Sequence, residues 1–267
     1  MRQNKYFNPG RFARLFRNDL MINQRTYLFA IAGLSIGIYA TLYLFKITNN
    51  GYSNPDPFQY YIPYFTMYTI IIGAFIGMSF QFFNNQTKTN NYLLTPGSTF
   101  EKYLVQLCIR VFIFIPLALG IFWIATYLAK ASMIPYPKTN FDPSKIPNFH
   151  FIDLFKYVPK FTDKLVTVFS IFSFATVLFA GSAWFNRFAL VKTLIATGMT
   201  IGMVVMTFVL FSHVFYPDIV HGFDIHIGSY KITEDLKNTQ LAFYLLGGLA
   251  WLFFLPLAYF KLKEKEV

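Results

Sequence analysis

The side chains best suited to metal binding gather in one polar segment in the last third of the chain. Three of the four histidines lie there with two aspartates, and imidazole and carboxylate groups are typical ligands of zinc or copper. The residues are His213, Asp218, His221, Asp224 and His226. The histidines are 8 and 5 residues apart, which matches no established zinc-ligand spacing. Since the polarity of a loop explains them without an ion, we predict no metal site.

No other motif indicates an enzyme. The chain contains neither an HExxH zinc motif nor a GxxxxGK[ST] phosphate-binding loop. An intramembrane serine protease would need serine and histidine together at membrane depth, and the histidines lie in polar segments or at the edge of an apolar one. Cys108, the single cysteine, lies in an apolar run, where a thiol packs as a small hydrophobic group. We expect no catalytic residues and no cofactor bound by this chain.

The segment 84–103, NNQTKTNNYLLTPGSTFEKY, is the most informative polar stretch. Thr95, Pro96 and Gly97 form a turn signal. Ser98 and Glu101 then have the spacing of a capping box, in which each side chain bonds the other's backbone amide at the start of a helix. We predict a helix that begins here and continues without a break into the next apolar segment. A force on the short segment before the turn would then reach that helix. The alternative is a well-capped connector without a partner.

An amphipathic helix is predicted over residues 10–25. Its apolar side chains fall on one broad side, and Arg11, Arg14 and Arg17 fall largely on the other. Asp19 and Asn23 interrupt the apolar side. Such a helix is typical of the membrane interface, with arginines near anionic headgroups. The alternative for residues 1–26 is a basic leader that only sets the membrane topology.

These polar segments are separated by long apolar stretches. The chain is 55% hydrophobic with a mean hydropathy of +0.43 and only 13% charged residues, whereas soluble domains have about 25%. A bilayer core about 30 Å thick needs roughly 20 apolar residues in a helix. Uniformly apolar stretches of this length exclude an outer-membrane barrel, whose strands alternate. Six segments qualify: 27–45, 62–83, 104–128, 165–185, 188–211 and 241–260.

We therefore predict an all-α polytopic membrane protein whose residues 1–267 form one domain. The centres of the six segments hold no Asp, Glu or Lys, so nothing there would bind a coupling ion, and work would need energy from a partner. Arg110 lies near the start of the third segment, where we expect it to snorkel toward water.

The positive charge is distributed unevenly about these segments. The net charge is +11, and 14 of the 23 basic residues, including all seven arginines, belong to one side with only 4 of the 12 acidic residues. The positive-inside rule places that side, with both termini and residues 84–103, in the cytoplasm. The charge thus has an explanation that needs no nucleic acid. Residues 129–164 and 212–240 become extracytoplasmic loops, and the aromatic stretch 149–161 is predicted to lie on the membrane surface.

Pairs of glycines four residues apart occur in three of the six segments. This spacing leaves two bare positions on one helix face, where a neighbouring backbone can approach closely. The pairs are Gly33 with Gly37, Gly73 with Gly77, and Gly198 with Gly202. We predict tight helix packing at these positions, within the chain or at a dimer interface.

The loop motif carries a resemblance to a known family. Tyr92, Leu93, Leu94, Thr95, Pro96, Ser98, Glu101 and Lys102 form a pattern that resembles the "LL-x-TP-x-S-x-x-E" loop of ABC transporter permeases of the type-2 exporter class, in a version similar to flavobacterial ones. Six spans, cytoplasmic termini and an N-terminal interfacial helix are also similar to that class. In residues, the resemblance covers about 15 positions.

The resemblance implies a multi-pass subunit in a bacterial inner membrane. It implies that residues 84–103 form a coupling helix seated in a separate ATP-binding cassette subunit, which would hold ATP and magnesium. It also implies a second permease copy, in a homodimer closed by the first and fifth spans, or a related permease. The second outer loop, 129–164, is longer than in the simplest members. An ATP-driven exporter is thus the leading hypothesis, and a non-transporting scaffold of a cell-envelope complex is the alternative.

Overall fold

Helices make up almost all of the chain that the computed structural model describes, as the all-α prediction requires. The described residues are 7–48, 57–84, 86–132, 147–158, 160–185, 188–215, 231–233 and 236–266. The helices are α1 (Pro9–Ile22), α2 (Gln24–Thr48), α3 (Pro57–Ile76), η1 (Gln81–Asn84), α4 (Gln86–Leu94), α5 (Thr99–Leu107), η2 (Cys108–Ile113), α6 (Phe114–Ala131), η4 (Phe151–Phe155), α7 (Phe161–Trp184), α8 (Ala189–Phe215) and α9 (Asn238–Glu266). Two short strands, β1 (Lys231–Thr233) and β2 (Leu236–Lys237), pair antiparallel.

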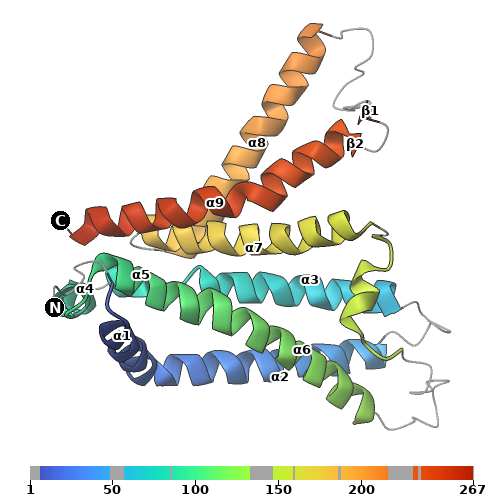
Figure 1. Ribbon diagram of the computed structural model, residues 1–267. Coiled ribbons are helices and arrows are strands. Elements are labelled where there is room, and N and C mark those ends of the chain that lie inside the picture. The colour runs from blue at the N-terminus through green and yellow to red at the C-terminus, as the bar shows by residue number, and fades with distance from the viewer. Residues whose placement is uncertain are drawn as a thin grey trace.

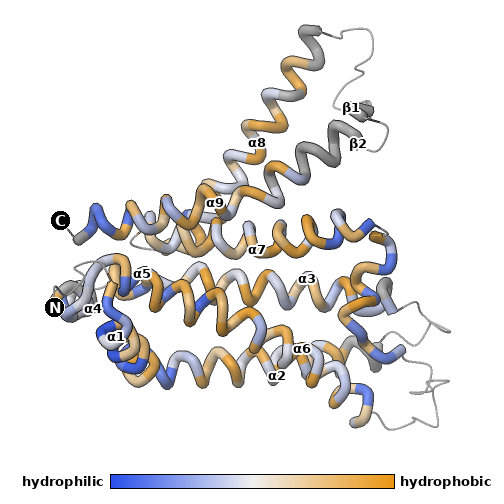
Figure 2. The backbone as a smooth tube through the Cα atoms, viewed as in Figure 1, coloured by the Kyte–Doolittle hydropathy of each residue, from blue (hydrophilic) through white to orange (hydrophobic). Residues whose placement is uncertain are grey.

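The long helices form an elongated bundle from which α8 diverges (Figure 1). In the bundle α2, α3, α6 and α7 run along one another, and α9 lies against α7. The three short helices α1, α4 and α5 gather at the end of the bundle where the C-terminal end of α9 also lies. Hydrophilic residues concentrate on α1 and at the C-terminal end of α9, and apolar residues dominate the helices between (Figure 2).

Four helical stretches are long and apolar enough to cross a membrane: Gln24–Leu44, Thr99–Ala131, Phe161–Trp184 and Ala189–Phe211. They correspond to the first, third, fourth and fifth predicted segments. The second predicted segment corresponds to a shorter apolar helix, Tyr60–Ile76. The sixth, 241–260, lies within α9. The chain therefore has the composition and helix lengths of a membrane protein.

The second segment is shorter than predicted because α3 ends at Ile76 and not near residue 83. After Ile76 the backbone tightens, with the amides of Met78 and Ser79 donating to the carbonyls three residues before them, at 3.2 and 3.0 Å. The Ser79 hydroxyl also donates to the Ile76 carbonyl at 2.5 Å. Gly77 itself still follows the helix, because its amide donates to the Gly73 carbonyl at 2.8 Å. The chain then enters the 3₁₀ helix η1.

The third segment is continuous, as predicted, but contains a π-helical turn. α5 passes into η2 and then α6 without an interruption. Pro116 explains the irregularity, because it has no N–H to donate to the carbonyl of Phe112 and its ring would clash there in a regular α-helix. Wider π turns relieve such a clash and are frequent at functional sites.

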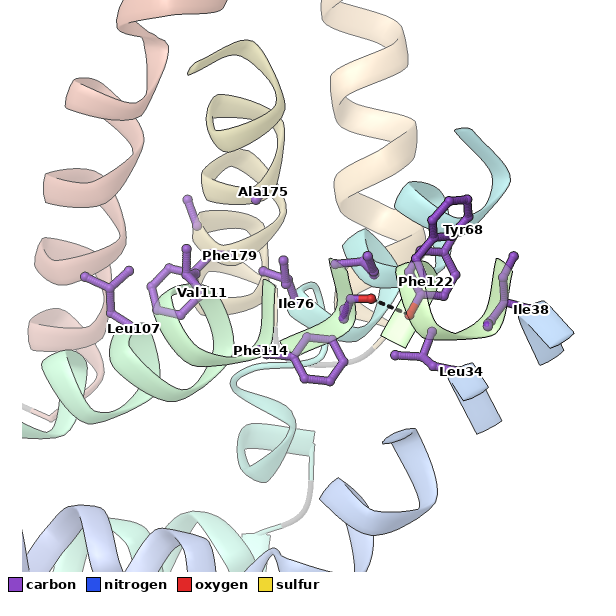
Figure 3. Close-up of a cluster of buried hydrophobic side chains, with 14 of the residues drawn as sticks. Leu34, Ile38, Tyr68, Ile76, Leu107, Val111, Phe114, Phe122, Ala175 and Phe179 are labelled. Atoms are coloured by element: carbon purple, nitrogen blue, oxygen red, sulfur yellow. Dashed lines mark hydrogen bonds between the residues drawn. The ribbon is translucent and has the colours of Figure 1, made fainter. Parts of the chain in front are cut away.

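The core lies between α2, α3, α6 and α7, with contributions from α5 and α9, and combines aliphatic side chains with several buried aromatic rings (Figure 3). Phe122 is fully buried between Phe65 and Tyr68, with ring centroids 5.3 Å from each. The Tyr68 hydroxyl is buried there and donates a hydrogen bond to the Ala118 carbonyl at 2.9 Å. Nearer α5, Phe75 stacks on Phe114 at 4.0 Å.

The aromatic stretch 149–161 differs from the prediction at its beginning. Phe149 does not lie on the surface but inserts into the bundle, with its ring 5.1 Å from those of Tyr61 and Phe122. The Tyr61 hydroxyl donates to the Pro147 carbonyl at 2.9 Å and fixes this segment. Ile152 and Phe161 are exposed, as expected of a membrane-surface stretch. The prediction was wrong for Phe149 because a polar loop was assumed to lie wholly outside the core.

Candidate partner-coupling site

A sharp turn joins α4 to α5 and is anchored on α1. The amide of Thr95 donates to the Tyr92 carbonyl at 3.2 Å, which closes the turn. Gly97 then passes directly over Leu15 of α1, where an added Cβ would lie 2.7 Å from a leucine methyl carbon. Only glycine fits this approach without displacing Leu15. The turn is therefore held against the amphipathic helix.

The capping box predicted from Ser98 and Glu101 is confirmed. The Ser98 hydroxyl accepts from the Glu101 amide at 3.2 Å, and the Glu101 carboxylate accepts from the Ser98 amide at 3.1 Å. These bonds satisfy two of the backbone donors that a helix start leaves without intrahelical partners. They set the first residue of α5 and thereby the direction of the long helix that follows.

The Glu101 carboxylate also binds α1. The Arg11 guanidinium donates two hydrogen bonds to it, from Nε at 2.5 Å and from Nη2 at 2.9 Å, and the Asn8 amide donates a third at 2.7 Å. The Glu101 side chain is fully buried, and that of Arg11 is 30% exposed. The hydrogen bonds to Glu101 raise the pKa of Arg11. One carboxylate thus fastens the first turns of α1 and α5 together.

Asn8 caps α1 and was not predicted from the sequence. Its side chain accepts from the amides of Gly10 and Arg11, at 3.0 and 3.4 Å. The signal was present, because asparagine followed by proline is a typical helix start. The helix begins at Pro9 and ends at Ile22, with Asn23 in the turn before α2. The predicted single helix 10–25 is therefore two helices that meet at Asn23.

The three arginines predicted at the membrane surface have different environments. Arg14 and Arg17 are exposed, as that prediction requires. Arg11 instead turns toward Glu101. The face of α1 that contacts α5 places Leu15 against Val105 and Ile109. Thus α1 has one packed face and one exposed basic face.

Aromatic rings hold lysines at this end of the bundle. Tyr92 stacks on Phe82 at 3.9 Å, and the Lys102 ammonium lies 4.9 Å from the centre of the Tyr92 ring. Lys265, near the end of α9, lies 4.5 Å over Phe83, and burial lowers its pKa to about 8. Such cation–π contacts let a positive charge remain beside an apolar surface.

The predicted coupling residues therefore divide into an inward and an outward set. Tyr92, Glu101 and Lys102 face the bundle, whereas Leu94 is 81% exposed and Pro96 is also exposed. Thr95 and Ser98 are half-buried in the turn, and the side chain of Leu93 lies outside the described part of the structure. The exposed Leu94 and Pro96 form a small apolar contact surface on the outer side of the turn. The inner side of the turn is fixed to the helices of the bundle.

A second polar cluster links α1 to the long helix one turn farther along. The Asp19 carboxylate accepts from Gln106 Nε2 at 2.8 Å, from the Tyr27 hydroxyl at 2.6 Å and from Asn23 Nδ2 at 3.1 Å. Asp19 thus interrupts the apolar side of α1 because it bonds to α2 and α5. The sequence offered no pairing signal between positions 19 and 106.

Arg110 does not snorkel to water as predicted. It is buried with 6% exposure, and its guanidinium carbon lies 5.0 Å from the Tyr27 ring centre and 4.5 Å from that of Phe75. The π-helical turn η2 contains Arg110, and its wider backbone sets the direction of this side chain. The charge is accommodated by ring faces and lies in the same region as the Asp19 cluster.

The three predicted glycine pairs also differ. Gly73 and Gly77 are packed, since an added Cβ would lie 2.8 Å from a Leu178 methyl carbon and 2.6 Å from one of Leu190. The other pairs face open space, with no atom within 4 Å of an added Cβ: Gly33, Gly37, Gly198 and Gly202. Gly181, which has no partner at this spacing, forms the closest helix contact, against Thr193 of α8.

The histidine-rich segment falls mostly outside the described residues. His221, His226, Asp218 and Asp224 are not described, and of His213 only its place in α8 is. In the described part of the chain, no three His, Cys, Asp or Glu residues lie close enough to hold a metal ion. Comparison of the chain with protein-family models, with curated proteins and with solved structures found no match.

Proposed function

We propose that this chain is the membrane-spanning permease subunit of an ATP-driven exporter. In this proposal it crosses a bacterial inner membrane six times with both termini in the cytoplasm. A separate ATP-binding cassette subunit binds ATP and magnesium and contacts the turn between α4 and α5. The chain itself catalyses no reaction. The observation that carries the proposal is the division of the turn into exposed Leu94 and buried Glu101.

This division suits the transfer of force. A partner that moves the surface at Leu94 would move a turn fixed by the Glu101 bonds to Arg11, Asn8 and Ser98. The same turn starts an uninterrupted helical stretch, Thr99–Ala131, that is long enough to cross a bilayer. The stretch is continuous, with the π-helical turn η2 after α5, so in this proposal a displacement at its capped start moves the helix that follows. The chain would change shape between α6 and the neighbouring helices.

A second copy of the chain belongs to the proposal. The glycine faces of α2 and α8 are open, and beyond Thr193 no described side chain of α8 is buried. Bare faces on two apolar helices are suited to close contact with another membrane helix. The path for the exported molecule would form between the two copies, beside aromatic and small polar side chains.

The variant Leu94→Asp tests this function. We expect it to abolish co-purification of an ATP-binding cassette protein with the chain, and to reduce ATP turnover of the reconstituted complex to that of the free ATPase. Because Leu94 is 81% exposed, the thermal unfolding of the chain in detergent should not change. Ile152→Asp is the matched control, since Ile152 is 79% exposed on η4.

Retention of the ATPase by Leu94→Asp would refute the proposed contact. If the wild-type chain binds no ATPase and instead co-purifies with envelope proteins, the scaffold alternative replaces the exporter. The scaffold alternative is tested by deleting part of the loop 129–164 and measuring whether an envelope partner is lost. The deletion should leave Phe149 in place, because removing this buried ring would disturb the core.

A further inference from the structure

A polar cavity lies between α1, α4 and α5, beside the turn but separate from its exposed surface. Its volume is about 430 Å³, within the range of roughly 300–1,000 Å³ typical of ligand pockets. Asp19, Asn23, Lys102 and Gln106 line it together with apolar side chains, Leu15, Ile22 and Val105 among them. Asn18 lines it as well, so the cavity combines one carboxylate, one ammonium group and three amides with an apolar wall.

Gln106 leaves an acceptor without a donor in this cavity. The residue is 4% exposed, and its Nε2 donates to Asp19. Its Oε1 is buried and accepts no hydrogen bond from any described residue. The opposite orientation of the amide would place two oxygens against each other, so the nitrogen must face the carboxylate. An unmet buried acceptor is costly, and a ligand with an N–H or O–H group would satisfy it.

The charges in the cavity favour a ligand with two opposite charges. The Asp19 carboxylate accepts from three neutral donors, Tyr27, Asn23 and Gln106, and forms no ion pair with any residue in the described part of the chain. An ammonium group between Asp19 and Gln106 Oε1 would meet a negative charge and an acceptor that has no other donor. The Lys102 ammonium, 6% exposed and stacked on Tyr92, lines the same cavity and would attract an anionic group.

The position of the cavity favours a membrane lipid over a freely soluble molecule as the ligand. It lies where α1 meets the first residues of the candidate span Gln24–Leu44, and beside the start of the candidate span Thr99–Ala131. The ends of spanning helices lie at the depth of lipid headgroups. Ile22, which lines the cavity, is 72% exposed, and its neighbours Met21 and Leu20 are 58% and 39% exposed. An exposed apolar rim at headgroup depth fits a lipid better than a freely soluble molecule.

We propose that this cavity binds the headgroup of a phosphatidylethanolamine-type lipid, with the primary ammonium at Asp19 and Gln106 Oε1 and the phosphate toward Lys102. A phosphatidylcholine headgroup has the same charges but no N–H, so it cannot donate to Gln106. The bound lipid would lie between α1 and α5, at the contact that fixes the coupling turn.

Native mass spectrometry of the full chain, purified in detergent and supplied with defined lipids, tests the proposal. We expect phosphatidylethanolamine to be retained about tenfold more than phosphatidylcholine of the same acyl chains, the ratio that one hydrogen bond to a charged group supplies. Stepwise N-methylation of the headgroup should preserve retention until the last N–H is lost. Equal retention across this series would overturn the proposal without any variant.

Two variants locate the site. Gln106→Met removes the acceptor at similar volume and should bring the retention ratio close to one, whereas Gln24→Met, an exposed glutamine on α2 outside the cavity lining, should leave it unchanged. A Gln106→Met chain that still selects phosphatidylethanolamine would overturn the assignment. Soluble phosphoethanolamine should displace the lipid only in large excess. If the soluble compound binds and the lipid does not, the lipid source is refuted.

Discussion

Two helices of this protein carry the same glycine spacing and use it differently. Gly73 in α3 and Gly77, directly after the end of α3, allow side chains of α7 and α8 to pack against the backbone. In α8, Gly198 and Gly202 face open space, and the apolar residues around them are exposed. The spacing therefore makes a close approach possible without determining whether a partner fills it. Whether glycine is required depends on which atoms lie opposite.

One substitution, glycine to alanine, can measure this difference. The added group is the same methyl everywhere, so the change in the free energy of unfolding reports the space available at each position. The interior of a helix bundle is close-packed, so a single added methyl group changes its stability. Three positions give a graded series.

Gly181→Ala should have the largest effect. Its new Cβ would lie 2.7 Å from the Cβ of Thr193, a short branched side chain that cannot swing away, and Thr193 is 4% exposed. We expect α7 and α8 to separate at a cost of about 2–3 kcal/mol, the upper part of the range for overpacked cores. Thermal unfolding in detergent measures the loss. A variant as stable as the wild type would show that α7 and α8 are not packed at this point.

Gly73→Ala should have an intermediate effect. The new Cβ would lie 2.8 Å from a methyl carbon of Leu178 and 3.1 Å from the Phe174 ring. Both contacts are with the ends of flexible side chains, so we expect a cost of about 1 kcal/mol as they shift. The same unfolding measurement applies. A loss equal to that of Gly181→Ala would mean that Leu178 and Phe174 yield no more easily than Thr193 does.

Gly198→Ala should have the smallest effect, because nothing lies within 4 Å of the added Cβ. Because alanine also has the higher helix propensity, we expect the monomer to lose no free energy of unfolding and to gain at most about 1 kcal/mol. The bulkier Gly198→Leu should leave monomer stability unchanged and lower the dimer fraction seen by light scattering. A destabilised Gly198→Ala monomer would contradict the open face.

The local features of the candidate site were predictable from the sequence. The turn at Thr95–Gly97 and the capping box of Ser98 and Glu101 depend on residues three or four positions apart, so their spacing alone indicates the geometry. The amphipathic character of α1 and the continuity of α5 with α6 follow from periodicity and from the absence of a helix stop. The early end of α3 was not predicted, because an apolar run does not reveal where the backbone tightens after Ile76.

The contacts between distant segments required the tertiary structure. Glu101 meets Arg11 and Asn8 across about ninety positions of sequence, and Gln106 meets Asp19 across a similar distance. No local pattern encodes such pairs, because side chains on different helices meet only after the helices have packed. The same holds for Arg110, which was expected to reach water and lies between two rings.

The sequence by itself determined the class of the protein: an almost entirely helical chain with apolar segments of membrane-spanning length and a basic, amphipathic N-terminal helix. These properties depend on composition and on periods of a few residues, which the chain carries at every point. Only the tertiary structure decided which glycines are packed, which coupling residues face outward and where a polar cavity remains. Those outcomes depend on which surfaces meet, and two identical glycine pairs become different as soon as one of them has a neighbour.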